Sequence, residues 1–311
     1  MPQQIEPRVS TLESTYKARD VEGVLDLCFY RPIGFRLAQF FARVEMKPAG
    51  VTLLAGLLGI IAGHLFYYRD LRTNVVGMAL LVCANALDNA DGQLARLTHR
   101  ESREGRIIDS VADHLVSVSI YVHLTLRYLV EGASPAVCLL ALAAGISHAL
   151  QGAAADYYRT AYLYFATNRS PMELDSSSVL RSNFRELSWP HEPWHKFLLA
   201  LYLNFTRQQE MLSPNLKNLR DTAARLLRGK IPSWFKSRYK SLAGPALKWW
   251  GLLMTNTRML VLFALLLIGE PVWYFWFELI PLNLLFVYLI VRQENVSKSL
   301  LGLVTTRRDS A

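Results

Sequence analysis

The stretch "DNADGQLARLTHRESREGRIIDSVAD", residues 88–113, carries four aspartates at the edge of strongly apolar sequence. An apolar run at 73–87 leads into it, and another at 107–130 overlaps its end. A charge in hydrocarbon is costly, so an ionisable residue beside a membrane span is by default a functional-site hypothesis. The stretch therefore predicts a site at a membrane boundary, built on Asp88, Asp91, Asp109 and Asp113.

The composition favours a membrane protein over a soluble one. The chain has 311 residues, of which 52% are hydrophobic, and yet its formal net charge is +9. A positive balance suits a membrane protein whose cytosolic loops hold Lys and Arg, and it favours anionic lipid. Nucleic acid is the competing partner for a basic chain. The basic residues lie between apolar spans in no recognition module, and the three cysteines fit no zinc spacing, so we expect no nucleic-acid partner.

Six apolar segments predict transmembrane helices, and the first is long enough to cross hydrocarbon about 30 Å thick. They cover residues 48–68, 73–87, 107–130, 134–158, 242–268 and 271–291, the last closed by the polar "RQENVSKS". The first holds Gly59 and Gly63, a GxxxG pair that suits close helix packing, either within the chain or between two copies. Before it, residues 21–45 have amphipathic spacing, which we expect Pro32 and Gly34 to interrupt.

The predicted fold class is an all-α integral membrane protein with six transmembrane helices, an amphipathic N-terminal helix and a cytosolic helical insertion. The predicted units are an interfacial segment at 1–46, four spans at 47–163, a basic insertion at 164–240, and two spans with a tail at 241–311. The positive-inside rule places the insertion, the Arg-rich loop at 96–106 and both termini in the cytosol. We expect a bacterial inner membrane, with the site facing the cytoplasm.

The acid spacing predicts a metal centre. Asp88 and Asp91 share one helix face, and Asp109 and Asp113 share another, so an antiparallel helix pair could bring both faces together. Two like charges about 4 Å apart repel by roughly 4 kcal/mol at an effective dielectric constant near 20. Oxygen ligands this close suit Mg²⁺ or Mn²⁺, and two such ions would form the usual clamp for phosphoryl chemistry. Nearby, small Gly92 and Ala95 leave room for a bulky ligand, and Arg96 can bind phosphate.

The spacing matches D-x2-D-G-x2-A-R-x8-G-x3-D-x3-D at all eight specified positions, which are Asp88, Asp91, Gly92, Ala95, Arg96, Gly105, Asp109 and Asp113. In this motif the sequence resembles the CDP-alcohol phosphatidyltransferase family. The resemblance is specific over 88–113, is limited to hydropathy over the spans, and does not extend to 164–240. It implies a homodimeric six-helix membrane enzyme with a two-metal centre. It also implies transfer of a substituted phosphoryl group from a CDP-linked donor to a polar alcohol, with release of CMP.

The resemblance also implies residue roles. Asp88, Asp91 and Asp109 would ligate metal, and Asp113 would both ligate metal and act as the general base. Gly92, Ala95, Arg96 and Ser102 would lie against the donor, whereas Gly105 would serve packing. Thr52 is assigned to the donor site too, although the "PAGVT" run at 48–52 departs from the Pro-Asn that many members have there.

The acceptor alcohol stays open in the sequence. Arg159, with the arginines of the insertion, could bind a phosphorylated acceptor such as inositol phosphate or glycerol phosphate, or could merely anchor a helix at the interface. His114 follows the predicted base and is a weaker acceptor candidate. Two other functions are alternatives: a CDP-ethanolamine or CDP-choline type phosphotransferase acting on a lipid hydroxyl, and a non-catalytic transporter or scaffold.

A zinc-protease pattern competes for one short segment. "HEPWH", from His191 to His195, matches H-E-x-x-H. That pattern needs both histidines on one continuous helix. Pro193 lies between them, so we predict that a helix begins here and that no zinc site forms.

Overall fold

The chain folds into a bundle of long helices with no strand among the residues that the structure describes. This computed structural model describes residues 19–167, 174–226 and 231–309. A short 3₁₀ helix, η2 (Arg19–Val21), and a π-helical turn, η3 (Asp26–Tyr30), come first. The helices are α1 Arg31–Arg43, α2 Pro48–Leu65, α3 Leu71–Leu97, α4 Arg103–Val130, α5 Ala136–Thr167, α6 Ser177–Glu186, α7 Pro193–Leu212, α8 Pro214–Leu226, α9 Ser233–Ala243, α10 Leu247–Gly251 (after the turn η4, Gly244–Ala246), α11 Thr255–Leu267, α12 Trp273–Leu279 and α13 Pro281–Asp309. The predicted all-α membrane fold is confirmed.

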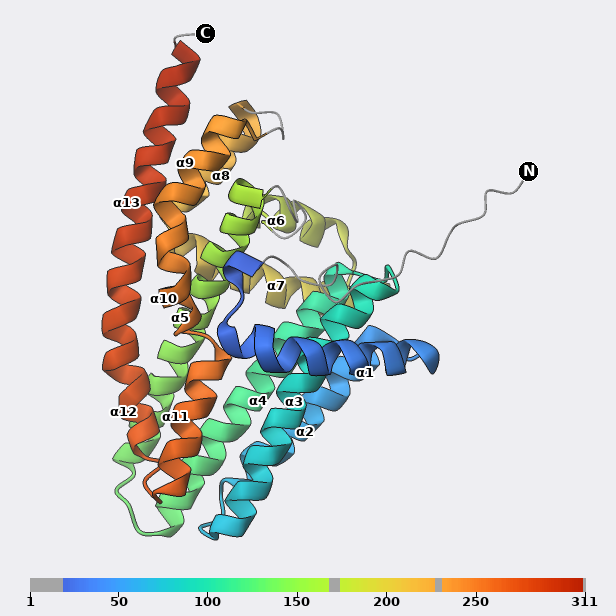
Figure 1. Cartoon of the computed structure of the whole chain (residues 1–311), viewed down its shortest axis with the longest axis vertical. Coiled ribbons are helices and arrows are strands. Elements are labelled where there is room, and N and C mark those ends of the chain that lie inside the picture. Colours follow the sequence, from blue (N-terminus) through green and yellow to red (C-terminus); the bar gives the residue numbers. More distant parts are fainter. Residues whose placement is uncertain (1–18, 168–173, 227–230, 310–311) are drawn as a thin grey trace, which may run out of the picture.

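Five segments in the described part of the chain are long and apolar enough to cross a membrane. They are Pro48–Leu65, Arg103–Val130, Ala136–Thr167, Ser233–Leu267 and Trp273–Thr306. The expected second span lies in α3, a 27-residue helix whose Asn and Asp side chains lower its hydropathy. Helix α2 packs against both α3 and α4, and α4 packs against α5. Figure 1 shows α2, α3 and α4 running side by side, with α11, α12 and α13 beside α5. The count of six spans stays a prediction.

The GxxxG pair serves packing within the chain. A Cβ atom on Gly59 would lie 2.5 Å from Val116 Cγ2, and one on Gly63 would lie 2.6 Å from Ser119 Oγ and 2.9 Å from Ile120 N. These distances are shorter than any real Cβ contact, so α2 approaches α4 closely only because both positions lack a side chain.

Helix α1 crosses the ends of the long helices, as Figure 1 shows. Regular α-helix begins at Arg31, after the π-helical turn η3, so the expected interruption falls just before Pro32, which lies in the first turn of α1. The expectation that Gly34 interrupts the pattern is wrong, because Gly34 lies inside α1. A Cβ on Gly34 would lie 3.2 Å from the backbone N of Ala90, so this glycine lets α1 lie against α3. On its outer side Phe40 and Val44 are exposed, which is typical of a helix in the headgroup plane.

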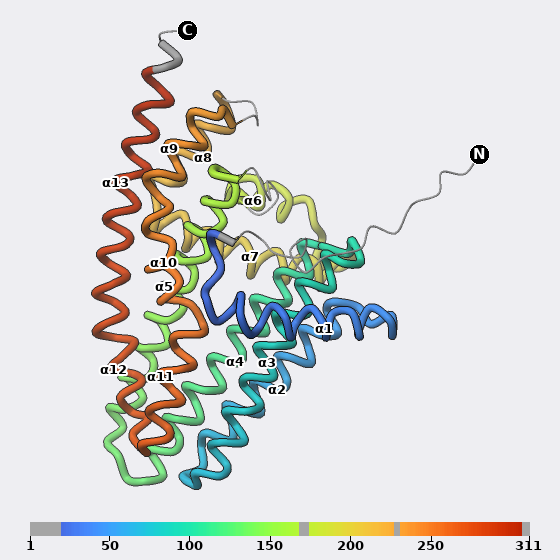
Figure 2. Tube along the Cα trace, viewed as in Figure 1, coloured from blue at the N-terminus to red at the C-terminus, as the bar shows by residue number. Residues whose placement is uncertain are grey.

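The insertion contains helices, as predicted, but its expected boundaries at 163 and 240 fall inside α5 and α9. Glu210 of α7 joins α6 and α8. It accepts hydrogen bonds from the backbone N (2.9 Å) and Oγ (2.6 Å) of Ser177, and it forms an ion pair with Arg220 (2.8 Å). Burial alone would raise the pKa of Glu210. The hydrogen bonds from Ser177 and Arg220 outweigh it and lower the pKa to about 2. Figure 2 shows α6, α7 and α8 at the end of the bundle opposite the turn between α4 and α5.

The last helix extends beyond the expected sixth span. Polar residues at 292–299 were expected to close the span, but α13 continues through them to Asp309. Within this extension Glu294 accepts hydrogen bonds from the backbone N of Asn215 (2.7 Å) and of Leu216 (3.2 Å) and from the Tyr158 hydroxyl (3.0 Å). One carboxylate thus caps the start of α8 and connects it to α5 and α13.

Candidate active site

Three of the four aspartates lie together. Asp88 and Asp91 lie on α3, and Asp109 lies two turns into α4. Each offers one carboxylate oxygen within 4.8 Å of the others. The chain reverses between the two helices in five residues. His99 there takes a left-handed φ of 53°, and the Ser102 side chain caps α4 by accepting a hydrogen bond from Gly105 N (3.0 Å). The short reversal sets the two acidic faces opposite each other.

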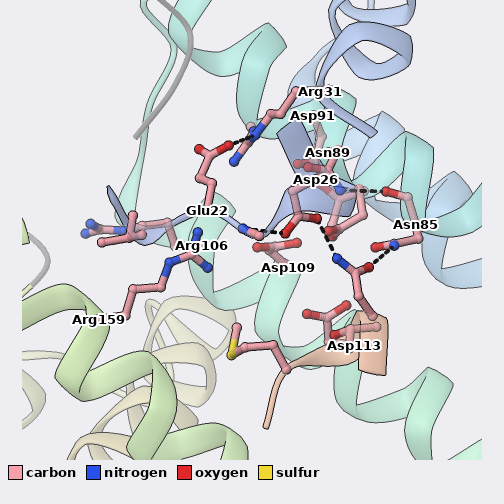
Figure 3. A pocket seen from close by; sticks show the side chains of 18 of the residues that line it. Glu22, Asp26, Arg31, Asn85, Asn89, Asp91, Arg106, Asp109, Asp113 and Arg159 are labelled. Atoms are coloured by element: carbon pink, nitrogen blue, oxygen red, sulfur yellow. Dashed lines mark hydrogen bonds and ion pairs between the residues drawn. The ribbon is translucent and has the colours of Figure 1, made fainter. Parts of the chain in front are cut away.

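Asp113 lies outside this group of three. It is one turn further along α4 than Asp109, is exposed, and lines the same cavity. In Figure 3 it lies below Asp109, on the side nearer the α11 ribbon. The structure therefore separates one carboxylate from the three that could share an ion.

The donor set fits a divalent cation. Three carboxylates supply only oxygen atoms, as Mg²⁺ and Mn²⁺ prefer. Thr52 Oγ1 donates a hydrogen bond of 2.5 Å to Asp91 Oδ2 and also lies 3.1 Å from Pro48 O. A hydroxyl that fixes a ligating carboxylate in this way is common around metal sites. Thr52, which the sequence assigned to the donor, thus also contacts Asp91.

The acids open into a cavity of about 1490 Å³. Its walls come from the segment before α1, the start of α2, the facing ends of α3 and α4, α5 at Ala155 and Arg159, and the α10–α11 region. This volume is sufficient for a nucleotide-sized ligand.

The predicted donor-site residues all line this cavity: Thr52, Gly92, Ala95, Arg96 and Ser102. The Arg96 guanidinium lies 3.6 Å from where a Gly92 Cβ would be, which is ordinary van der Waals contact, so the two positions are neighbours on the cavity wall. Ser102 also acts as the cap of α4. A Cβ on Gly105 would meet only Ser102 Oγ, at 3.0 Å, so this glycine lies at a helix cap and not between helices.

The two candidate acceptor-binding residues, Arg159 and His114, lie in different places. Arg159 lines the cavity, and Figure 3 shows it beside Arg106 on one side of the opening. His114 does not line it: its ring Nδ1 contacts Ser110 O at 2.6 Å and its ring packs against Phe205.

The two histidines of "HEPWH" do not share a helix. Pro193 is the first residue of α7, as predicted, so His191 precedes the helix. His195 pairs with Glu104 at 2.9 Å. The arrangement is a helix start and not a zinc site.

Sequence reasoning missed a polar bridge across the cavity. Asn256 of α11 donates to Asp26 Oδ1 (2.8 Å) and accepts from Asn85 of α3 (3.1 Å), as Figure 3 shows. Asn89 Nδ2 donates to Asn85 O (2.9 Å). Asn85 and Asn89 could have been suspected as amides beside the acids on one face of an apolar helix. Asn256 is 171 positions from Asn85 and 230 positions from Asp26 along the chain, and only the fold brings the three side chains together.

The family model described as CDP-alcohol phosphatidyltransferase matches residues 46–166, which contain all four aspartates. The matched segment is similar to the CDP-alcohol phosphatidyltransferase family and makes up less than half of the chain. It covers α2 to α5 and leaves the insertion unmatched.

Two curated relatives share this segment. The chain is 30% identical over 96 residues to archaetidylinositol phosphate synthase from Pyrococcus horikoshii, which covers 31% of this chain and 50% of that protein. It is 30% identical over 116 residues to phosphatidylinositol phosphate synthase from Streptomyces avermitilis, which covers 37% of this chain and 46% of that protein. The chain thus spans about half the length of the curated relatives it matches.

Proposed function

We propose that this chain is a CDP-alcohol phosphatidyltransferase. It transfers a lipid-phosphate group from a CDP-linked lipid to inositol phosphate and releases CMP. The observation that carries the proposal is the cavity that combines the aspartates of the family motif with Arg106 and Arg159. The printed names of both relatives point to the same acceptor class.

The proposed reaction is one displacement at phosphorus. The acceptor's hydroxyl oxygen attacks the donor phosphorus that carries the lipid, and the bond from that phosphorus to the oxygen of CMP breaks. Asp113 accepts the proton of the attacking hydroxyl, since it is exposed to the cavity and lies apart from the three grouped acids. Arg96 binds the diphosphate and favours departure of anionic CMP.

Asp88, Asp91 and Asp109 are the residues that would hold divalent ions, with Thr52 keeping Asp91 in place. When bound, such ions supply Lewis-acid stabilisation of the charge on the transferred phosphate.

The two arginines on one side of the cavity support an anionic acceptor. Arg106 and Arg159 would attract a phosphate and repel a cationic head group. The CDP-ethanolamine or CDP-choline alternative requires a cationic head group in the same cavity, so this charge disfavours it.

The site is proposed to face the cytoplasm. The basic loop at 96–106 lies at the site's end of the bundle, which supports a site that faces the cytoplasm of a bacterial inner membrane. The family also implies a homodimer. The Gly59–Gly63 face does not supply the dimer interface, because α4 covers it.

The test is an acceptor panel. Purified protein in detergent is given a CDP-linked lipid, Mn²⁺ or Mg²⁺, and one of inositol phosphate, inositol, glycerol phosphate, serine or ethanolamine, and CMP release is measured. We expect release with inositol phosphate and at least tenfold less with inositol.

Asp113→Asn should fold normally and abolish release with every acceptor, and Arg159→Gln should raise the KM for inositol phosphate but not for the donor. Arg181→Gln, on the exposed face of α6, is the matched control. Equal turnover of inositol and inositol phosphate, or near-normal turnover by Asp113→Asn, would overturn the proposal.

A further inference from the structure

Helix α7 presents an uncharged stripe to its surroundings. Trp194, Phe197, Leu201 and Met211 have exposed fractions of 57%, 45%, 37% and 80%. Their spacing of 3, 4 and 10 residues places them along one helix face. Asn204 and Gln208 fill the positions between Leu201 and Met211, so the face carries no charge over its whole length.

The opposite face of α7 is packed against the protein. Leu199 and Leu203 are buried there, with Thr206, Gln209 and Glu210 further along the helix, so the protein side of α7 is already occupied. A helix between protein and water normally presents charged or polar residues outward. The neighbouring α6 does so with Arg181, Ser182 and Arg185.

The contacts of α7 with α4 give its depth. Helix α4 has 28 residues and is therefore about 42 Å long, roughly 12 Å more than the hydrocarbon it crosses. With the far end of α4 at the opposite boundary, about the first eight residues lie in the headgroup zone. The His195 Nε2 atom is 2.9 Å from Glu104 Oε1 in the first turn of α4, and the Phe205 ring centroid is 6.3 Å from that of His114, at the edge of the hydrocarbon. Helix α7 thus runs from the headgroup zone to the hydrocarbon boundary.

Contacts with α5 agree with this depth. Gln209 Nε2 donates to Ala153 O (3.1 Å) and to Asp156 Oδ2 (3.2 Å). The neighbouring Ala155 lines the active-site cavity, so α7 lies at the level of the site. Figure 2 shows α1 and α7 both lying across the long helices.

We infer that α7 is a second interfacial membrane helix, inclined to the membrane plane, and that its Trp194–Met211 stripe is covered by the headgroup and upper acyl region of the bilayer. Aromatic side chains favour this zone, where their rings meet both polar and apolar surroundings. The basic insertion is thereby held against the membrane by one helix, while α6 remains in water. This inference concerns a segment that the family match does not cover, and it goes beyond the proposed reaction.

The test places a probe on the stripe. Leu201→Cys is made in a variant whose native cysteines, Cys28, Cys83 and Cys138, are replaced by serine, because all three are exposed. The site is labelled with the fluorophore NBD, and the full chain is reconstituted in vesicles of phosphatidylcholine and phosphatidylglycerol. Ser182→Cys on the exposed face of α6 is the matched control, and Phe197→Cys is a second position in case the first fails to fold.

We expect lipids with a doxyl group to quench the probe at position 201 at least threefold more than the probe at 182, and aqueous iodide to show the reverse order. Equal iodide quenching at both positions, without quenching by doxyl lipid, would overturn the inference. Protection from both quenchers would also overturn it, since a second protein copy would then cover the stripe. The readout does not depend on catalysis, so failure of the proposed reaction would leave it interpretable.

Discussion

Replacing Thr52 with valine separates its two possible roles. Valine has nearly the same shape and the same β-branching, so the packing of α2 is kept while the hydrogen bond of 2.5 Å to Asp91 Oδ2 is lost. A hydrogen bond to a charged group contributes about 1.5–3 kcal/mol. At about 1.4 kcal/mol per factor of ten, this loss corresponds to an affinity for divalent ions about 10- to 100-fold weaker, the size usual for residues that orient metal ligands.

The assay is CMP release at saturating CDP-linked lipid as Mn²⁺ is varied. We expect the half-maximal Mn²⁺ concentration to rise about 10- to 100-fold in Thr52→Val. Thr52→Ser keeps the hydroxyl and should resemble the unchanged protein. If Thr52→Val shows an unchanged Mn²⁺ requirement and a raised KM for the donor, Thr52 contacts the donor and the orienting role is refuted.

Two further predictions concern stability. Gly63→Ala should cost about 1–3 kcal/mol, because its Cβ would meet the Ile120 backbone N at 2.9 Å, and the Tm in detergent should fall by several degrees. Gly152→Ala, whose Cβ meets nothing within 4 Å, is its control, and equal Tm values for the two would contradict this packing. The pKa of Glu210 is lowered in the fold to about 2 from its ordinary value of 4.5, so its charge stabilises the fold fully above about pH 5 and that stabilisation is lost as the pH falls toward 2. The Tm of the unchanged protein should therefore fall more between pH 6 and pH 3 than that of Glu210→Gln, and parallel curves would count against the Glu210 network.

The sequence was sufficient for the fold class and for the position of the acids. Long uncharged runs predict spans because the bilayer sets one length for every crossing helix. Two acids three residues apart and two acids four residues apart must share helix faces, whatever the tertiary structure. The convergence of Asp88, Asp91 and Asp109 therefore followed from local spacing and one short turn.

Other features depend on contacts between distant segments. Asn256 meets Asp26 and Asn85 only because α11 folds back beside α3. Pro32 was expected to interrupt the helical pattern and α1 begins just before it, whereas Gly34, expected to interrupt it too, lies inside α1 against α3. The insertion was expected as a cytosolic unit. We expected its short helices to lie near the membrane surface, but the contact between Phe205 and His114 that gives the depth of α7 has no local signal.

Direct Mn²⁺ binding tests the central claim that the three grouped aspartates hold divalent ions. Free Mn²⁺ gives an electron paramagnetic resonance signal that weakens on binding, so titrating purified protein measures the bound ions without any turnover. We expect tight binding by the unchanged protein and by Glu186→Gln, an exposed acid on α6, and binding at least tenfold weaker in Asp91→Asn. Equal Mn²⁺ binding by Asp91→Asn and Glu186→Gln would contradict the metal centre.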